Sequence, residues 1–240
     1  MVEHLDEIGG PNHYNNYPWG WAQAGNTPLR FYKQNTYEGG IRDPLIIHWP
    51  NGIDDPGGIR DQYHHVIDVM PTILDVVGVV PPENFQGVEQ QPVEGTSMRY
   101  TFPSNACDTA TTRPKQYYEM MGHRAIWSDG WKAVTMHRKG EAFEDEEWAL
   151  YNTEKDFSEC HDLSSDEPEK LKEMVDLWWN EAESFNVLPL DDRGTELFVL
   201  RREDRVPPSK PQRFLKNTPH LERFKVPDIR NRSFEIAGKV

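Results

Sequence analysis

The clearest repeat of apolar positions lies in the second half of the chain. In "EPEKLKEMVDLWWNEAESF", apolar side chains return every three or four residues, at Leu171, Met174, Val175, Trp178 and Ala182. A helix places such positions on one face, because it has about 3.6 residues per turn. The pattern therefore predicts an amphipathic helix over residues 167–185.

Several short segments of strand character precede this helix. They lie at residues 115–121, 123–128, 131–137 and 148–152. Asp129-Gly130 separates the second from the third, and glycine accepts the positive φ that a tight hairpin turn needs. Together these segments predict a small antiparallel sheet that carries one helix.

The first hundred residues have a different pattern. The continuous apolar run "PLIIHWP" at 44–50 lies between prolines, which predicts a strand buried on both faces. Further along, Val66 and Ile67 predict a short strand. Asp68 can then cap a helix that ends at Gly78. Strand, loop and helix in this order predict the tail end of an α/β layer.

These patterns divide the chain into three parts. We expect residues 1–102 to belong to the α/β layer, 103–190 to the small sheet, and 191–240 to an extended tail that begins a further segment. Residues 9–30 mix Gly, Pro and Asn with Tyr and Trp, which predicts an ordered loop held by its aromatic side chains. In the tail, residues 196–204 predict at most one strand.

Composition and charge narrow the class of partner. The 240 residues include 8 Trp, 10 Phe and 9 Tyr, too many aromatic residues for a wholly disordered chain. The net charge of −14 repels phosphate backbones and anionic lipid, so we expect neither nucleic acid nor a membrane as partner. The acidic opening "MVEHLDEIGG" does not match a secretory signal, and no apolar run approaches the ~18 residues of a membrane span. The compartment, cytoplasmic or periplasmic, stays open.

One candidate for chemistry is the segment "FYKQNTYEGGIRDP". A lysine ammonium is a compact charge with three donors, so Lys33 can hold a tetrahedral oxyanion. Gly39 and Gly40 permit a tight turn after it, and Glu38 can brace that turn through an ion pair with Arg42. From the residues alone, Lys33 is either an anion-binding group or an ordinary solvated surface lysine.

A family resemblance favours the first interpretation. The run Lys33-x-x-x-Tyr37-Glu38-Gly39-Gly40, continued by "IRDPLIIHWPNGI", resembles the arylsulfatase segment in which a lysine binds the substrate sulfate. Four further stretches agree in order, namely "HHVIDVMPTILDVVGV", "EGTSM", "GHRAIWSDGWKAV" and "LYNTEKDFSECHDLSS". The likeness is greatest to large bacterial-type arylsulfatases, which also carry "GGPNHYNNYPWGWAQAGNTP" and "NVLPLDDR".

The resemblance implies a fold and an activity. It implies the C-terminal part of an alkaline-phosphatase-like α/β sandwich, and a sulfuric ester hydrolase in which Lys33 binds sulfate. Tyr37, Glu38, Gly39, Gly40 and Arg42 would support its loop. In the family, a formylglycine made from Cys/Ser-x-Pro-x-Arg attacks sulfur, while a calcium-type cation held by Asp-Asp and Asp-Asn pairs polarises the sulfate.

The catalytic groups of the family lie upstream of its lysine segment. Only 32 residues precede Lys33 in this chain, so we expect neither the nucleophile nor the calcium ligands within it. The chain alone is then expected to be inactive, with the missing N-terminal part as a possible partner. Two other interpretations stay open. One is a non-catalytic fragment or the partner-dependent half of a split enzyme, and the other is a phosphate or phosphonate ester hydrolase of the same superfamily.

Several motifs imitate catalytic or metal-binding groups. Cys107 and Cys160 lack the proline and arginine of the nucleophile motif, and "SKPQR" at 209–213 has them at the wrong end of the chain. "DDRG" at 191–194 lacks the buried strand that would aim two carboxylates at one ion. We expect none of these to be catalytic.

The remaining titratable residues are expected to be structural or solvated. His64 and His65 are expected to cap or pack rather than to bind a metal, because no carboxylates lie nearby at compatible spacing. His137 has no evident partner in the sequence. The acidic stretch 141–148 is expected to be a solvated loop.

Overall fold

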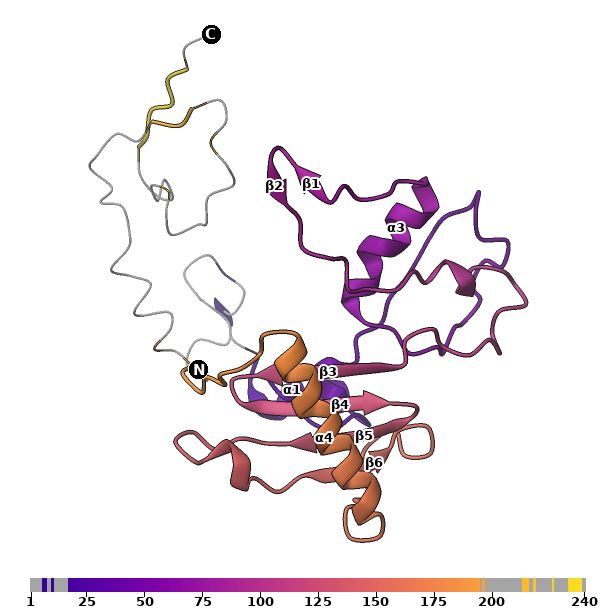
Figure 1. The fold of residues 1–240 in the computed structure, drawn as a ribbon, viewed down its shortest axis with the longest axis vertical. Coiled ribbons are helices and arrows are strands. Elements are labelled where there is room, and N and C mark those ends of the chain that lie inside the picture. The colour runs from indigo at the N-terminus through magenta and orange to yellow at the C-terminus, as the bar shows by residue number, and fades with distance from the viewer. Residues whose placement is uncertain are drawn as a thin grey trace. The chain divides into compact units, whose positions relative to one another are not determined.

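The structure is a computed structural model that describes residues 6–7, 10, 17–194, 196, 213–215, 218, 226 and 233–238 (Figure 1). It divides into two compact units, Met1–Leu190 and Asp191–Val240. The helices and strands given below lie in the first unit. The predicted division near residue 102 stays a prediction. The strand predicted over 196–204 lies outside the described residues, except for Glu196.

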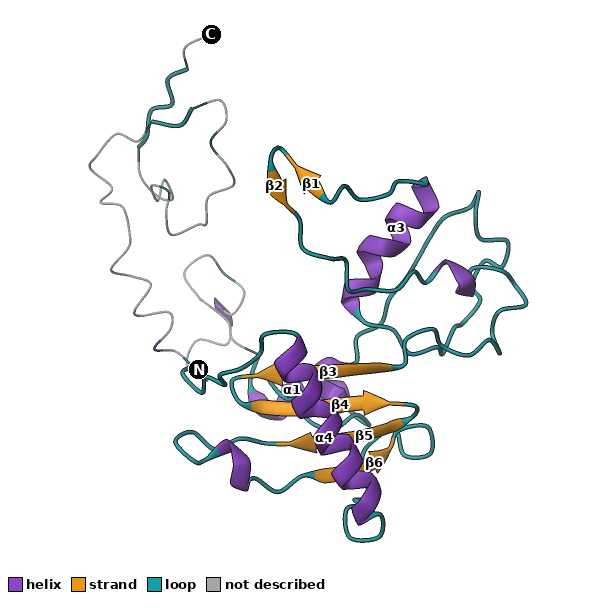
Figure 2. Ribbon diagram, in the orientation of Figure 1, coloured by secondary structure: helices purple, strands orange, loops and turns teal. Residues whose placement is uncertain are grey.

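The second half of the first unit is built on a four-stranded antiparallel sheet (Figure 2). Its strands follow chain order, as β3 (Lys115–Met120), β4 (His123–Ser128), β5 (Trp131–Thr135) and β6 (Ala149–Asn152). Asp129 and Gly130 both have positive φ, 49° and 76°, in the turn between β4 and β5. The predicted sheet and this hairpin turn are therefore confirmed.

Helix α4 (Pro168–Ser184) lies across one face of this sheet (Figure 2). Proline at its first position is favourable, because the first backbone N–H groups of a helix have no partner in the helix. Its side chains Met174, Trp178 and Ala182 form one core with residues of the sheet, chiefly Ile126, Ala133 and Leu150, and all six are fully buried. The predicted amphipathic helix is confirmed.

The opposite face of the sheet is covered by a different part of the chain. Side chains alternate between faces along a strand, so Ala125 and Val134 point away from α4. They pack with Tyr151 and with Tyr37, which comes from the segment that follows Lys33. The candidate lysine loop therefore lies on the small sheet.

Residues 66–102 contain short elements and one helix, α3 (Val69–Val77), which ends at Gly78 with φ 68° as its sequence predicts. The other elements are two short helical turns, Val66–Asp68 and Arg99–Thr101, and the pair β1 (Asn84–Phe85) and β2 (Val88–Glu89). The strand predicted at Val66 and Ile67 is wrong. The buried Asp68 carboxylate accepts the backbone N–H of His65, which curls this segment into a helical turn.

The strand predicted at 44–50 is also wrong, since this segment is an irregular, solvent-exposed connection. Ile46, at its centre, is 89% exposed. A strand needs a neighbour for its backbone N–H and C=O groups, and none of the described strands pairs with these residues. The apolar pattern is present, but the described residues supply nothing that covers it.

The loop predicted at 9–30 contains helix α1 (Trp19–Asn26). Its aromatic side chains do not hold it, because Tyr17, Trp19 and Trp21 are all largely exposed. Polar side chains do so instead. The Asn26 amide donates to the carbonyl oxygens of Phe31 and Gly39, at 2.9 and 2.7 Å. The expectation of aromatic anchoring is therefore wrong for the described part of this segment. Among the described residues, no helix is long and apolar enough to cross a membrane.

Candidate functional site

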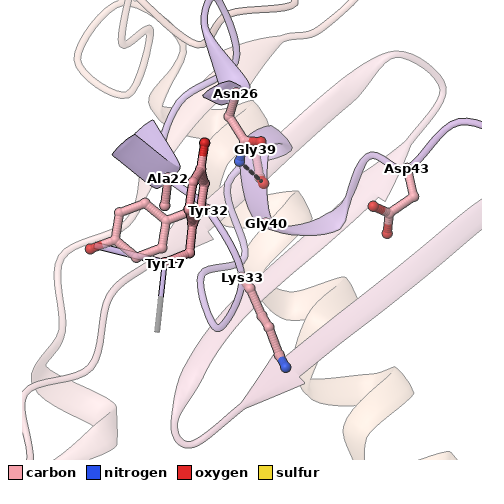
Figure 3. A pocket seen from close by; sticks show the side chains of 8 residues that line it. All are labelled: Tyr17, Ala22, Asn26, Tyr32, Lys33, Gly39, Gly40 and Asp43. Carbon is pink, nitrogen blue, oxygen red and sulfur yellow. Dashed lines mark hydrogen bonds between the residues drawn. The ribbon is translucent and has the colours of Figure 1, made fainter. Parts of the chain in front are cut away.

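Lys33 lines an open cavity of about 460 Å³ (Figure 3). The other lining residues are Tyr17, Ala22, Asn26, Tyr32, Gly39, Gly40 and Asp43. Within the described part of the chain, no carboxylate lies within the 4.0 Å ion-pair distance of the Lys33 ammonium. The side chain is solvent-exposed and its positive charge is available to an anion.

The two glycines beside Lys33 are required by close approach of backbone segments. A Cβ on Gly39 would lie 2.3 Å from the carbonyl oxygen of Phe31, and one on Gly40 would lie 2.0 Å from that of Asn35. Real Cβ atoms do not approach oxygen so closely, so any other residue displaces the loop. The Gly39 N–H donates to the Arg30 carbonyl at 2.9 Å, which closes residues 30–39 into one loop.

The Glu38 carboxylate, in the single helical turn α2 (Glu38–Ile41), is buried against the small sheet. Its Oε1 lies 2.9 Å from Nζ of Lys132 on β5, and its Oε2 lies 3.6 Å from the Arg42 guanidinium. The predicted Glu38–Arg42 ion pair therefore forms. Lys132 is the closer partner of Glu38 and was missed from the sequence.

A second carboxylate completes this contact. Oε1 of Glu159 lies 2.7 Å from Lys132 Nζ, an ion pair without hydrogen-bond geometry. Oε2 of Glu159 accepts the backbone N–H of Glu38 at 2.7 Å. Burial raises the pKa of Glu159, and the Lys132 charge beside it opposes that rise. We call Glu38, Lys132 and Glu159 the buried ionic triad.

Further contacts hold the lysine loop to the sheet. The Thr36 hydroxyl donates to the backbone carbonyl of Arg124 on β4, at 3.2 Å. The Tyr37 ring lies 6.2 Å from that of Tyr151 on β6, and the Arg30 guanidinium lies 4.7 Å from the Tyr37 ring centre. Burial raises the pKa of Tyr37, so its hydroxyl stays protonated at neutral pH. Residues 30–42 are thus fixed at several points.

His64 and Asp68 belong to a buried structural network. His64 bonds to Asp68 through Nδ1 at 3.1 Å and to the Tyr100 hydroxyl through Nε2 at 2.9 Å. Burial alone would raise the pKa of Asp68, but hydrogen bonds from Arg113 and from the backbone of His65 lower it well below its usual value. The expectation that His64 caps or packs is confirmed.

The acidic stretch 141–148 is solvated as expected at Glu141, Glu144, Asp145 and Glu147, but not at Glu146. The Glu146 side chain is only 6% exposed, and its carboxylate pairs with Arg124 on one oxygen and with Nδ1 of His137 on the other, the latter at 2.5 Å. His137 is therefore not isolated. Arg124 lies among the rings of Phe143, Trp148, Trp178 and Trp179, at 5.2 to 5.4 Å from their centres. This cluster places the Arg124 guanidinium on the face of the sheet that α4 covers.

The motifs that resemble catalytic or metal-binding motifs form no such site among the described residues. Asp191 accepts hydrogen bonds from Arg193, which hold its pKa at about 2, and both side chains are exposed. Cys107 and Cys160 are exposed free thiols. Apart from Arg213, residues 209–213 lie outside the described part. No group of three or more His, Cys, Asp or Glu side chains among the described residues can hold a metal ion.

Comparison with known proteins places the chain in a family. Residues 29–183 match the family model described as N-sulphoglucosamine sulphohydrolase, C-terminal. An uncharacterized sulfatase of Schizosaccharomyces pombe is 33% identical over 190 residues, which cover 78% of this chain and 33% of that protein. Arylsulfatase K of Xenopus laevis is 27% identical over 60% of this chain and 26% of its own length.

A solved structure agrees with these sequences. The crystal structure of Ps i-CgsB has a TM-score of 0.52 and 26% identity, over 73% of this chain and 36% of that one. The chain therefore belongs to the sulfatase family, whose alkaline-phosphatase-like α/β fold it shares in part. Within that family it matches the C-terminal region, and it spans about a third of the length of the yeast relative.

Proposed function

We propose that this chain is the sulfate-binding, C-terminal part of a sulfuric ester hydrolase, and that Lys33 holds the sulfate. The observation that carries this proposal is that Lys33 lines an open cavity and that its exposed ammonium has no ion-pair partner among the described residues. A tetrahedral anion accepts hydrogen bonds in several directions, which suits the three donors of an ammonium group. Tyr37, Glu38, Gly39, Gly40 and Arg42 support the loop.

The remaining catalytic groups would come from a polypeptide that carries the upstream part of a sulfatase α/β domain. That part would supply the formylglycine nucleophile and the ligands of a calcium ion, for which the described residues offer no suitable set. Calcium would polarise the sulfate when it is bound. In this chain, Lys33 would bind and orient the sulfate group, and its loop would keep that charge in place.

The exposed apolar residues of 44–80 support the proposal of an upstream partner. Met70, Ile73 and Val77, which we call the apolar face, lie on one side of α3 and are all more than half exposed. Leu45 and Ile46, in the connection before α3, are also more than half exposed. Isolated apolar residues are normal on a surface, but a helix that is apolar almost all round is usually covered. The family model is a C-terminal one, and about two thirds of Ps i-CgsB has no counterpart here. We therefore propose that the upstream part of the sulfatase covers this face.

Sulfate binding tests the role of Lys33 directly. Titration of the full chain with inorganic sulfate, followed by NMR, should shift the backbone amide signals of residues 31–42. Lys33→Ala should weaken the affinity on the order of tenfold or more, because the only charge proposed to hold the anion is removed. Lys155→Ala, at another exposed lysine, should leave it unchanged. Equal affinity in all three proteins would contradict the proposal.

Turnover tests whether the nucleophile and the calcium ligands come from an upstream segment. The chain alone, given an aryl sulfate and calcium, should show no hydrolysis, whereas the chain mixed with an upstream sulfatase segment should hydrolyse it. Hydrolysis by the chain alone would show that the catalytic machinery is present. Association without hydrolysis would support a non-catalytic fragment. A mixture that prefers phosphate or phosphonate esters would support the phosphoryl alternative, because Lys33 suits either tetrahedral anion.

A further inference from the structure

We propose that Lys132 and Glu159 are positioning residues, which fix the Lys33 loop on the small sheet through the buried ionic triad. This inference rests on the proposed function, because it concerns how Lys33 is held where it can bind sulfate. Neither residue belongs to the lysine segment. Lys132 lies 94 positions after Glu38 in the sequence, and Glu159 lies 121 positions after it.

The triad holds Glu38 through both its side chain and its backbone. Lys132 is completely buried on β5, and its ammonium lies between Glu38 at 2.9 Å and Glu159 at 2.7 Å. Glu159 also accepts the backbone N–H of Glu38. The side chain and the backbone of Glu38 are thus held by two different partners, which fixes both its place and its orientation.

The physics of buried ions favours a role in position over a role in stability. Burying a charge removes its hydration, and the attraction between buried partners only roughly repays that loss. Neutral side chains at all three positions of the triad could therefore give a sheet of similar stability, whereas loss of Lys132 alone leaves two carboxylates buried without their cation. An apolar residue at position 132 could not fix where Glu38 lies, because apolar contacts have no direction.

Fixing Glu38 also fixes Lys33. The Gly39 N–H donates to the Arg30 carbonyl, and the Asn26 amide bridges the carbonyls of Phe31 and Gly39. Both ends of the loop that carries Lys33 are therefore joined beside Glu38. A shift of Glu38 along the sheet moves the whole loop, and the cavity wall that includes Gly39 and Gly40 moves with it.

Other contacts would keep the loop docked if the triad were removed. Tyr37 packs against Tyr151, Ala125 and Val134, and Thr36 donates to the Arg124 carbonyl. We therefore expect Lys132→Met to leave the chain folded, with the loop on the sheet but less well fixed. Misplacement of a binding group by about 1 Å can lower its effectiveness by roughly 10- to 100-fold.

Amide hydrogen exchange and sulfate titration of the full chain test this inference. In Lys132→Met, the amides of residues 31–42 should exchange about tenfold faster, because local opening costs less. The affinity for inorganic sulfate should fall by about the same factor. Asp68→Asn is the matched control, since it neutralises another buried carboxylate paired with a buried cation, Arg113, which precedes β3. It should leave loop exchange and sulfate affinity unchanged even where it lowers the melting temperature.

A triple variant separates position from stability. Lys132→Met combined with Glu38→Gln and Glu159→Gln leaves no unpaired buried charge, so its melting temperature should return towards that of the wild type. Its sulfate affinity should stay about tenfold weak, because the ion pairs that fix the side chain of residue 38 are gone. A triple variant that regains full sulfate affinity would overturn the positioning role.

The outcomes distinguish this inference from the proposed function. Wild-type exchange rates in Lys132→Met would overturn the inference, whatever the chain binds. A wild-type chain that binds no sulfate would instead contradict the proposed function, while faster loop exchange in Lys132→Met would still support the triad as the group that fixes the loop. If Lys132→Met does not fold, Glu38→Gln provides the same comparison with side-chain volume conserved.

Discussion

Two regions of this chain are equally rich in apolar residues, yet only one of them buries these side chains. The small sheet and α4 form a closed core in which Ile126, Leu150 and Trp178 are inaccessible to solvent. In the region 44–80, helix α3 buries only Thr72, while Ile73 and Val77 are exposed. The two regions differ in whether a covering element exists among the described residues.

This difference shows which region has its apolar side chains covered by other parts of the same chain. The sheet has a helix on one face and the lysine loop on the other, so both faces contribute to stability. The helix α3 has apolar residues nearly all round, a pattern typical of a helix packed on several sides. The Lys33 loop is covered on one side only. Its Tyr37 side is held by the sheet, and its Lys33 side faces an open cavity.

The largest effect is expected in the closed core. Trp178→Ala should lower the free energy of unfolding by about 4 kcal/mol, because it removes a fully buried ring and leaves a cavity under α4. Urea unfolding followed by circular dichroism measures this change. Trp21→Ala removes the same side chain from α1, where it is 67% exposed, and should change the free energy by less than about 0.5 kcal/mol. Similar losses in the two variants would contradict the difference in burial between Trp178 and Trp21.

The next effect concerns the junction of the two regions. Asp68 begins α3 and pairs with Arg113, which precedes β3. Asp68→Asn should lower the free energy of unfolding by about 3 kcal/mol, because it leaves the Arg113 guanidinium buried beside a neutral group. The exposed pair of Arg99 with Asp75 is the control, and Asp75→Asn should cost much less, because solvent screens an exposed ion pair.

The same variant has a distinct pH dependence. The pKa of Asp68 is lowered in the folded chain below its ordinary value of 3.8. A lowered pKa in the folded state contributes stability above the unfolded value, and that stability is lost as the pH falls below it. The wild type should therefore lose stability on acidification below about pH 4 more steeply than Asp68→Asn. Parallel curves for the two proteins would contradict the assigned pKa shift.

The parts of the fold that the sequence predicted correctly depend on local patterns. Helix α4 and the turn at Asp129 and Gly130 follow from spacing and from the φ that glycine permits. The strand predicted at 44–50 failed for a physical reason. An apolar run reports that a segment needs cover, and it does not report whether that cover exists nearby.

The candidate site was predicted in part. The sequence indicated Lys33, the need for glycine after it and the pair of Glu38 with Arg42, because all of these lie within a few residues. It could not indicate Lys132 and Glu159. A lysine between apolar neighbours on a strand shows that a buried charge needs a partner, but 40 acidic residues are available and nothing local selects among them.

A smaller effect is expected at the lysine loop. Gly40→Ala should lower the free energy of unfolding by about 1–3 kcal/mol, because the added Cβ lies against the Asn35 carbonyl and the loop must shift. It should also weaken sulfate binding. Gly20→Ala is the matched control, since its Cβ meets nothing within 4 Å and alanine is the better helix former in α1. Thermal unfolding of both variants should show a loss for the first and a small gain for the second.

The smallest effect on the isolated chain is expected on the apolar face. Ile73→Ser on α3 should change the free energy of unfolding by less than about 0.5 kcal/mol, because the side chain already lies mostly in solvent. If an upstream sulfatase part covers this face, the same substitution should weaken association by about 1–2 kcal/mol, because apolar area is then buried. Titration calorimetry with that part measures the difference. If Ile73→Ser unfolds the isolated chain, α3 is not an uncovered surface. If the variant binds the upstream part as tightly as the wild type, that part does not cover α3.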